Sequence, residues 1–377
     1  MNQTLQFFLH LLTLCFATTS LSKGYSSEID ELETNLENLL RNGSILGAQA
    51  LVGEGDQFLY EKSFGVRSVK DPEPINADTQ FCIGSCSKPF ASATLFVLAQ
   101  NNRLSLNTRI NRWLPQFAEP TIVGSKTPTR SPNMLELLAH RGGIYSQKRG
   151  MNRRQARWIR DFRLTLEEAV NGIAGEELIY EPGTEYAYSG AGYCVLGRVA
   201  EVVLGQSFET LFQQRLAQPL QLERTTYFPD PEESNIATGS IKGNPNPATP
   251  HLSAPFHLPL IGGSLYSTAR DTSRFARMIL DRGRFGDRTL FEPESYKNYL
   301  SLPFAGKAYG MGWTIRKENN RPVEISHTGS LASSRASLRI NLDTGRYAIV
   351  FYTLTDPIVS VKTGQSINRA IGTAFKE

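Results

Sequence analysis

Apolar residues recur along the chain with two periods, and the dominant period changes with position. Spacings of three and four residues predict amphipathic helices over residues 29–40, 271–282 and 361–375. Alternating or β-branched runs predict strands over residues 48–52, 57–64, 312–316, 323–326, 334–342 and 347–353. The turn Gly53-Glu54-Gly55-Asp56 joins the first two of these strands into a hairpin. Strands therefore gather at both ends of the chain.

The region between about 100 and 260 carries helical patterns, prolines and loops, with few strand signals. The simplest architecture is an α+β fold in which one sheet is assembled from both ends of the chain and a helical lobe is inserted between them. We place the sheet lobe at about 23–84 and 262–377 and the helical lobe at about 85–261, with a cleft between the lobes as the expected site. The 377 residues are enough for a substantial core.

A short apolar run, Leu5 to Ala17, is followed by small and polar residues. It is too short to span a bilayer, so residues 1–22 are predicted to be a secretory signal peptide, although no Lys or Arg precedes the run. The remaining domain, 23–377, is expected to be periplasmic or secreted, with no stable membrane span. Cys82, Cys86 and Cys194 would remain after cleavage, and their pairing is open.

The formal net charge of +4 is unevenly distributed. Residues 148–163 carry seven Lys and Arg residues against one Asp, so the rest of the chain is slightly acidic, which argues against a nucleic-acid-binding protein. Arg153, Arg157 and Arg160 have helical spacing. Two interpretations stay open: a solvated basic helix face, or a border of the cleft that attracts anionic substrates.

The strongest candidate for chemistry is Ser85-Cys86-Ser87-Lys88. A serine hydroxyl is a poor nucleophile without a base within hydrogen-bond reach, and residues three apart share one face of a helix. Pro89 is tolerated in the first turn, so Ser85 is placed at or just before the start of a helix that continues to residue 99. Ser-x-x-Lys alone recurs by chance, and further elements have to support it.

Two such elements occur later in the chain. Residues 182–193 form a turn that leads into a helix, with Tyr188 at the bend. Residues 324–330 form a strand end that presents His327, Thr328 and the unhindered backbone of Gly329. With Ser-x-x-Lys, these elements resemble the serine β-lactamase-related superfamily, in its class C, DD-peptidase and esterase branch.

The resemblance covers nearly the whole mature chain, in the right order and spacing. Further matching segments are 98–117, Leu137-Leu138-Ala139-His140-Arg141-Gly142-Gly143, 262–271 and Tyr309-Gly310-Met311-Gly312-Trp313. It implies a β-lactamase/DD-peptidase-like fold, with an antiparallel sheet flanked by helices. At His140 it implies a structural turn and a buried, hydrogen-bonded side chain.

The resemblance also implies the catalytic roles. Ser85 would be the acylated nucleophile, Lys88 would help to deprotonate it, and Tyr188, partly phenolate, would be the second acid/base. Backbone N–H groups of Ser85 and Ser330 would form the oxyanion hole. The wall that aligns the substrate would comprise His327, Thr328, Gly329 and Gly190.

Two departures from the family pattern bear on the substrate. Gly190 stands where the family usually has Asn, and His327 stands in place of Lys, which weakens the fixed positive charge. Both favour a carboxylesterase-like acyl hydrolase acting through an acyl-Ser85 intermediate. The alternatives are a DD-peptidase or class C β-lactamase, and a non-catalytic penicillin-binding module. The expected partner is a small ester, amide or peptide; His251 and His257 lack zinc-ligand spacing, and no metal or cofactor is expected.

Overall fold

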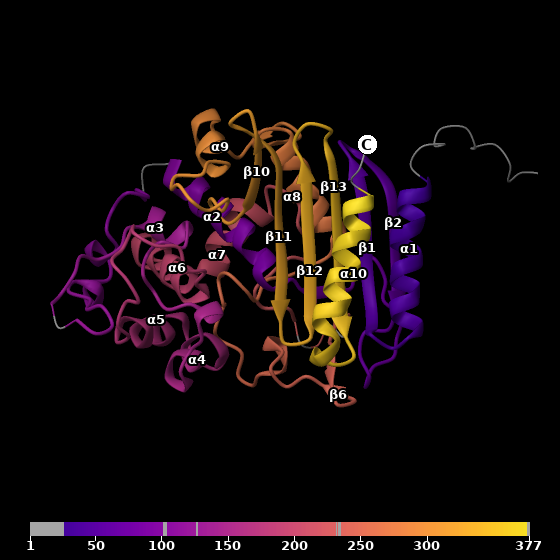
Figure 1. Cartoon of the computed structure of the whole chain (residues 1–377), viewed down its shortest axis with the longest axis horizontal. Coiled ribbons are helices and arrows are strands. Elements are labelled where there is room, and N and C mark those ends of the chain that lie inside the picture. The colour runs from indigo at the N-terminus through magenta and orange to yellow at the C-terminus, as the bar shows by residue number, and fades with distance from the viewer. Residues whose placement is uncertain (1–25, 101–103, 126, 231, 233–234, 375–377) are drawn as a thin grey trace, which may run out of the picture.

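A six-stranded antiparallel sheet organises the molecule (Figure 1). The computed structural model describes residues 26–100, 104–125, 127–230, 232 and 235–374, so the predicted signal peptide lies outside the described residues. The strand order is β10-β11-β12-β13-β1-β2. The bounds are β1 (Ile45–Glu54), β2 (Gln57–Gly65), β10 (Thr314–Glu318), β11 (Arg321–Leu331), β12 (Ser334–Asn341) and β13 (Arg346–Leu354).

The predicted α+β fold, with one sheet built from both ends of the chain, is confirmed. Strand β1 pairs with β13, so that Ala50 lies opposite Val350 in the register. The predicted hairpin is β1 and β2, which pair in antiparallel register. Strand β11 runs through the predicted strand end that carries His327 and Gly329, beyond the 323–326 run that the alternation alone predicts.

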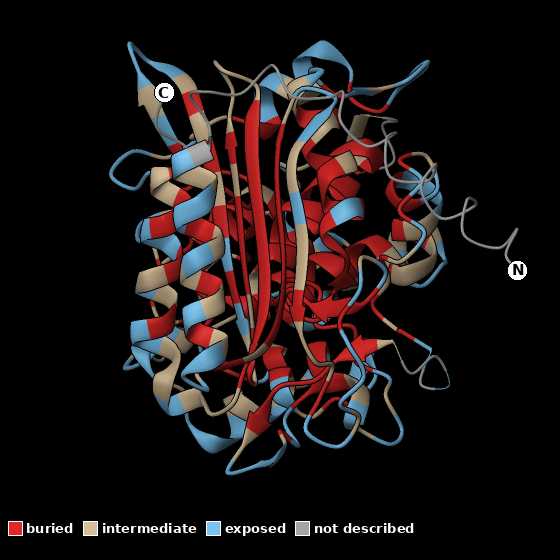
Figure 2. Ribbon diagram, turned by 90° about the vertical axis from the view of Figure 1, so that its right-hand side faces the viewer, coloured by how far each residue is buried: buried red, intermediate tan, exposed pale blue. Residues whose placement is uncertain are grey.

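Two helices cover one face of the sheet, α1 (Ser26–Arg41) and α10 (Ser360–Thr373). Both were predicted, with slightly different ends. Figure 2 shows the central strands buried and exposed residues on the outer surfaces of the helices. Leu32 and Leu36 of α1 and Ile367 of α10 share one apolar cluster with sheet residues such as Val350, which fixes the two helices to this face.

The other face is covered by α2 (Ser87–Gln100) and α8 (Ala269–Leu280), and the helical region lies beyond them (Figure 1). Residues 87–98 of α2 are all buried, which is typical of a central helix that is surrounded by other elements. The remaining helices are α3 (Met134–Leu138), α4 (Arg153–Arg160), α5 (Leu166–Ala174), α6 (Gly190–Leu204), α7 (Phe208–Phe212) and α9 (Pro293–Tyr299).

Ser85 lies just before the start of its helix, as predicted, and a short strand and a turn lead up to it. Residues Gln80–Cys82 form strand β3, which pairs with β4 (Ile236–Ala237) and β7 (Tyr266–Ser267) in a small sheet. A 3₁₀ turn, Gly84–Cys86, then leads into α2. Phe81 is buried and paired on both sides in the small sheet, so the helix starts only after this strand.

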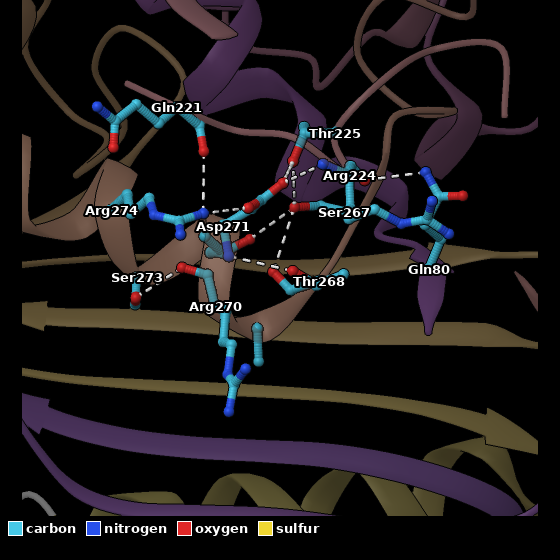
Figure 3. A network of polar contacts seen from close by, with 12 residues as sticks. Gln80, Gln221, Arg224, Thr225, Ser267, Thr268, Arg270, Asp271, Ser273 and Arg274 are labelled. Carbon is cyan, nitrogen blue, oxygen red and sulfur yellow. Dashed lines mark hydrogen bonds and ion pairs between the residues drawn. The ribbon is translucent and has the colours of Figure 1, made fainter. Parts of the chain in front are cut away.

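A buried polar network holds α8 against the loop that carries Arg224 and Thr225 and precedes β4 (Figure 3). The Asp271 carboxylate accepts hydrogen bonds from the Arg224 N–H at 2.7 Å and from the Thr225 hydroxyl at 2.8 Å, and it pairs with Arg274 at 2.7 Å. Thr268 caps the helix by accepting a hydrogen bond from the Asp271 N–H. A carboxylate with several donors can remain buried, and here it joins α8 to the loop that carries Arg224 and Thr225. Within the described residues, no helix has the length and apolar character needed to cross a bilayer.

Candidate active site

Ser85 lies on the 3₁₀ turn directly before α2, and two glycines bring this turn against strand β11. Gly84 has φ +55°, and a Cβ there would lie 2.4 Å from the main-chain nitrogen of Ser330. A Cβ at Gly329 would lie 1.9 Å from the carbonyl oxygen of Ile83. Only glycine allows both approaches. The nucleophile turn and the strand that carries Ser330 are therefore in direct contact.

Lys88 lies one helical turn after Ser85 and is fully buried. Its Nζ is 3.3 Å from the Oγ of Ser85 and donates to the carbonyl oxygen of Gly262 at 2.7 Å. Burial lowers the pKa of Lys88 to about 7, with a smaller lowering by the charge of Lys148. At neutral pH a large fraction of this amine is therefore unprotonated and able to accept a proton.

Tyr188 lies just before α6, and its ring centroid is 4.5 Å from the Nζ of Lys88. Burial raises the pKa of Tyr188 well above 10, although a hydrogen bond with the Ser85 side chain opposes this rise. The side chain is therefore a neutral phenol. This differs from the partly phenolate tyrosine expected from the resemblance, because the buried site penalises the anion more than its neighbours stabilise it.

His327, on β11, is a neutral hydrogen-bond acceptor in this site. Its Nδ1 lies 2.7 Å from the carbonyl oxygen of Thr328, which can only accept, so the Nδ1 carries the proton. Its Nε2 therefore accepts from the Tyr309 hydroxyl at 3.1 Å and lies 3.5 Å from the Tyr188 hydroxyl. Burial lowers the pKa of His327 to about 3. The sequence predicted less positive charge at this position than a Lys would carry. In the structure, His327 carries no charge at neutral pH.

His140 packs against the rings of Tyr188 and Tyr309. Its Nδ1 accepts a hydrogen bond from the Ser189 N–H at 3.1 Å, and its ring centroid lies 4.2 Å from that of Tyr188 and 4.8 Å from that of Tyr309. Burial holds the pKa of His140 well below its usual value, so it is neutral. The predicted structural role for His140, buried and hydrogen-bonded, is confirmed.

Gly190 begins α6 and faces the side chain of Gln147. The Gly190 N–H donates to the Oε1 of Gln147 at 2.9 Å, and a Cβ at position 190 would lie 2.2 Å from the Nε2 of Gln147. The carboxamide of Gln147 thus fills the space of the missing Asn side chain. Gln147 was not singled out in the sequence, because it comes from a loop 43 residues away.

A cavity of about 500 Å³ opens over these residues. It brings together six of the eight predicted site residues, namely Ser85, Tyr188, His327, Thr328, Gly329 and Ser330. Lys88 and Gly190 do not line the cavity and lie behind it. Residues that the sequence analysis did not assign to the site complete the lining: Lys148, Tyr186, Lys307, Ala308, Tyr309 and Thr314. Tyr309 could have been found, because it opens a matched motif.

The basic segment 148–163 contributes one residue, Lys148, to this cavity. Arg154 pairs with Glu176, and Arg163 pairs with Asp161. Arg153, Arg157 and Arg160 are exposed on α4, whose Ile159 is buried. Of the two interpretations of the basic segment, the solvated basic helix face therefore applies to α4. Lys148, in contrast, lines the cavity.

The three cysteines in the described residues, Cys82, Cys86 and Cys194, are buried and unpaired. Burial raises the pKa of Cys82 and of Cys194 to about 12, so neither is a reactive thiolate. No cluster of three or more His, Cys, Asp or Glu side chains suited to a metal ion occurs in the part of the chain that the structure describes.

Comparison with known proteins places this geometry in a family. The sequence profile of the Beta-lactamase family matches residues 32–370. Penicillin-binding protein 4 of Amycolatopsis lactamdurans is 27% identical over 318 residues, which cover 78% of this chain and 76% of that protein. Esterase EstB of Burkholderia gladioli is 28% identical over 240 residues, which cover 61% of this chain and 59% of EstB.

Among solved structures, EstCE1, described as a hydrolase with promiscuous acyltransferase activity, superposes with a TM-score of 0.75 at 20% identity. The match covers 93% of this chain and 100% of EstCE1. The chain spans 38% of the length of one curated relative and 60% of several others. The profile match covers most of the described residues and includes every element of the site. The chain therefore belongs to the β-lactamase family of serine hydrolases.

Proposed function

We propose that the protein hydrolyses carboxylic esters through an acyl-Ser85 intermediate. The observation that carries the proposal is the Lys88 amine, which is buried, has a pKa lowered to about 7 and lies 3.3 Å from the Ser85 Oγ. A base of this kind activates a serine hydroxyl at neutral pH. A module that only binds would gain nothing from a desolvated lysine at this position.

The proposed reaction begins when Lys88 accepts the Ser85 proton and the Oγ attacks the ester carbonyl carbon. The oxyanion forms beside the main-chain N–H groups of Ser85 and Ser330, which the contact between Gly84 and β11 brings close together. As the C–O bond breaks, the neutral phenol of Tyr188 donates a proton to the leaving alkoxide and regains one from the Lys88 ammonium. Water then attacks the acyl-serine and releases the acid.

His327, Thr328 and Gly329 are proposed to align the substrate along β11, and all three line the cavity. His327 accepts hydrogen bonds through its Nε2, so it supports the neutral forms of the tyrosines around it. Gly190 leaves room for the carboxamide of Gln147 beside Tyr188.

Ester hydrolysis is tested by turnover of a short-chain nitrophenyl ester beside nitrocefin, a chromogenic β-lactam, with fluorescent penicillin as a label for Ser85. We expect ester turnover that Ser85→Ala abolishes and Tyr188→Phe reduces by about 10²-fold or more. Tyr186→Phe is the matched control, because Tyr186 lines the same cavity but the cation over its ring is Lys307, whereas Lys88 lies over Tyr188. Ester turnover that survives in Ser85→Ala would refute the mechanism.

The second candidate is DD-peptidase or β-lactam-directed activity. It is favoured by the similarity to a protein named Penicillin-binding protein 4, which covers 78% of this chain. Fluorescent penicillin that labels Ser85 stably, without ester turnover, would favour this candidate over the esterase.

We further propose that the protein acts outside the cytoplasm, because residues 1–22 have the pattern of a signal peptide. Sequencing the N-terminus of the protein recovered from its native host tests this: a mature chain that retains Leu5 to Ala17 would contradict it.

A further inference from the structure

Two lysines without a described acidic partner lie in the wall of the cavity. Lys148 precedes α4 and Lys307 precedes β10, and both side chains are exposed. The Nζ of Lys148 is 4.8 Å from the ring centroid of Tyr188, and the Nζ of Lys307 is 5.8 Å from that of Tyr186. The two ammonium groups therefore lie over tyrosines that are two residues apart in the chain.

The cavity carries no compensating negative charge among its described lining residues. Its lining contains no Asp or Glu side chain. The nearby carboxylate Glu185 pairs with Arg149 at 3.2 Å, and His327 is neutral. The charge of Lys148 contributes to lowering the pKa of Lys88, His140 and His327, so its field reaches the reacting atoms. The cavity wall thus carries two positive charges, and that of Lys148 acts on Lys88.

The loop that carries Lys307 is tied to the tyrosine segment by Arg141. The guanidinium of Arg141 donates to the carbonyl oxygen of Ala305 and to that of Thr184, and it lies 5.3 Å from the ring centroid of Phe304. One side chain therefore links the loop before β10 to the segment that leads to Tyr188. This link fixes the main chain two residues before Lys307.

We propose that Lys148 and Lys307 form an anion-binding subsite that selects esters bearing a carboxylate in the acyl or the alcohol part. The inference rests on the proposed ester hydrolysis and names its substrate class. The neutral His327 leaves strand β11 without positive charge at this position, and the charge lies instead on the two loops that carry Lys148 and Lys307. The subsite acts on substrate binding and leaves the Ser85 chemistry to Lys88 and Tyr188.

The test compares esters that differ only in a carboxylate against a carboxamide. On the acyl side these are the mono-nitrophenyl ester of succinic acid and the corresponding succinamate; on the alcohol side they are acetylated hydroxybenzoate and hydroxybenzamide. We expect the wild-type kcat/KM to favour at least one carboxylate ester. Lys148→Gln and Lys307→Gln should each reduce the preference for the carboxylate ester about two- to fivefold. Raising the salt concentration from about 0.02 M to about 0.5 M should reduce the same preference in the wild type. Lys362→Gln, which removes an exposed charge from α10 on the far face of the sheet, is the matched control and should change nothing.

A second measurement keeps this inference separate from the proposed function. The uncleaved esters are titrated into Ser85→Ala and into Ser85→Ala with either lysine substituted, and the affinity ratio of carboxylate to carboxamide is measured. A ratio that falls with each lysine substitution supports the subsite even if the wild type turns over no ester. A wild-type preference for the carboxamides, or ratios unchanged by both substitutions, would overturn the subsite while leaving ester hydrolysis intact.

Discussion

The main-chain N–H of Gly190 donates to the Oε1 of Gln147, while the Nε2 of the same carboxamide fills the space that a side chain at position 190 would need. A glycine at the start of α6 and a glutamine from a preceding loop therefore act as one unit. The carboxamide that the resemblance leads us to expect at position 190 is provided here by Gln147. It remains next to Tyr188, whose carbonyl oxygen accepts a hydrogen bond from the Ser146 hydroxyl.

This exchange predicts a strong coupling between the two positions. Gly190→Asn should push the Gln147 carboxamide aside and lower kcat/KM for esters about tenfold, and Gln147→Ala should cause a similar loss. The double variant should recover activity, because one carboxamide then occupies the space without competition. A double-mutant cycle should give a coupling of about 1 kcal/mol or more. Losses that simply add would contradict the shared space.

The state of Lys88 predicts the pH dependence of the rate. Because burial lowers its pKa to about 7, the amine becomes a base as the pH rises through that value. kcat/KM should therefore rise between about pH 6 and pH 8 and then level off. His327 should contribute nothing in this range, since its pKa is lowered to about 3. Stopped-flow acylation rates measure this profile, and a rate that falls with rising pH would rule out Lys88 as the base.

The same burial predicts a change in stability with pH. The pKa of Lys88 is lowered on folding, so between about 7 and the ordinary lysine value the unfolded chain holds a proton that the folded protein lacks. Raising the pH through this window therefore favours the folded state, by at most about 1.4 kcal/mol per pH unit. Lys88→Met should remove this contribution. Urea unfolding at the two ends of the window should show the wild type gaining on Lys88→Met as the pH rises; a constant difference would contradict the burial argument.

The contact between Gly84 and β11 predicts a position where a single methyl group is costly. Gly84→Ala would place a Cβ 2.4 Å from the nitrogen of Ser330, and this clash involves main chain that cannot rotate away. We expect a loss of stability of about 2 kcal/mol or more, and at least about 10²-fold lower acylation in the protein that folds. Gly55→Ala is the matched control, since Gly55 has φ +54° and open space around it. Equal effects of both substitutions on activity would show that backbone strain alone is responsible.

The sequence predicted the sheet and its helices because their apolar periods are regular, but in β11 the apolar alternation covers only residues 323–326, and the motif with His327 and Gly329 was needed to predict the rest. Val323 and Ile325 point inward and continue the alternation. His327 and Gly329 are the next inward residues, and their polarity or small size ends the hydrophobic signal although the strand continues. The apolar alternation of β11 therefore stops at His327 and Gly329, which line the cavity.

The site residues that lie in motifs were predicted, and those brought in by loop packing were not. Ser85 and Lys88 share a helix turn, so their proximity follows from local geometry. Gln147 and Lys307 reach the site only because distant loops fold against Tyr188 and Tyr186. No local pattern records such contacts, so these two residues required the three-dimensional structure.

The pairing of β1 with β13 joins strands from opposite ends of the chain at the centre of the sheet. On a ribosome, Ser85 and Lys88 are made long before β11 and β13 emerge. The turn at Gly84 packs against β11, so it has no packing partner until β11 has been synthesised. Pairing of strands that are this far apart in the sequence is slow. An unfinished chain therefore carries its nucleophile without the strand that bears Ser330. The protein is therefore inactive throughout its synthesis, and it becomes active only when β1 has paired with β13.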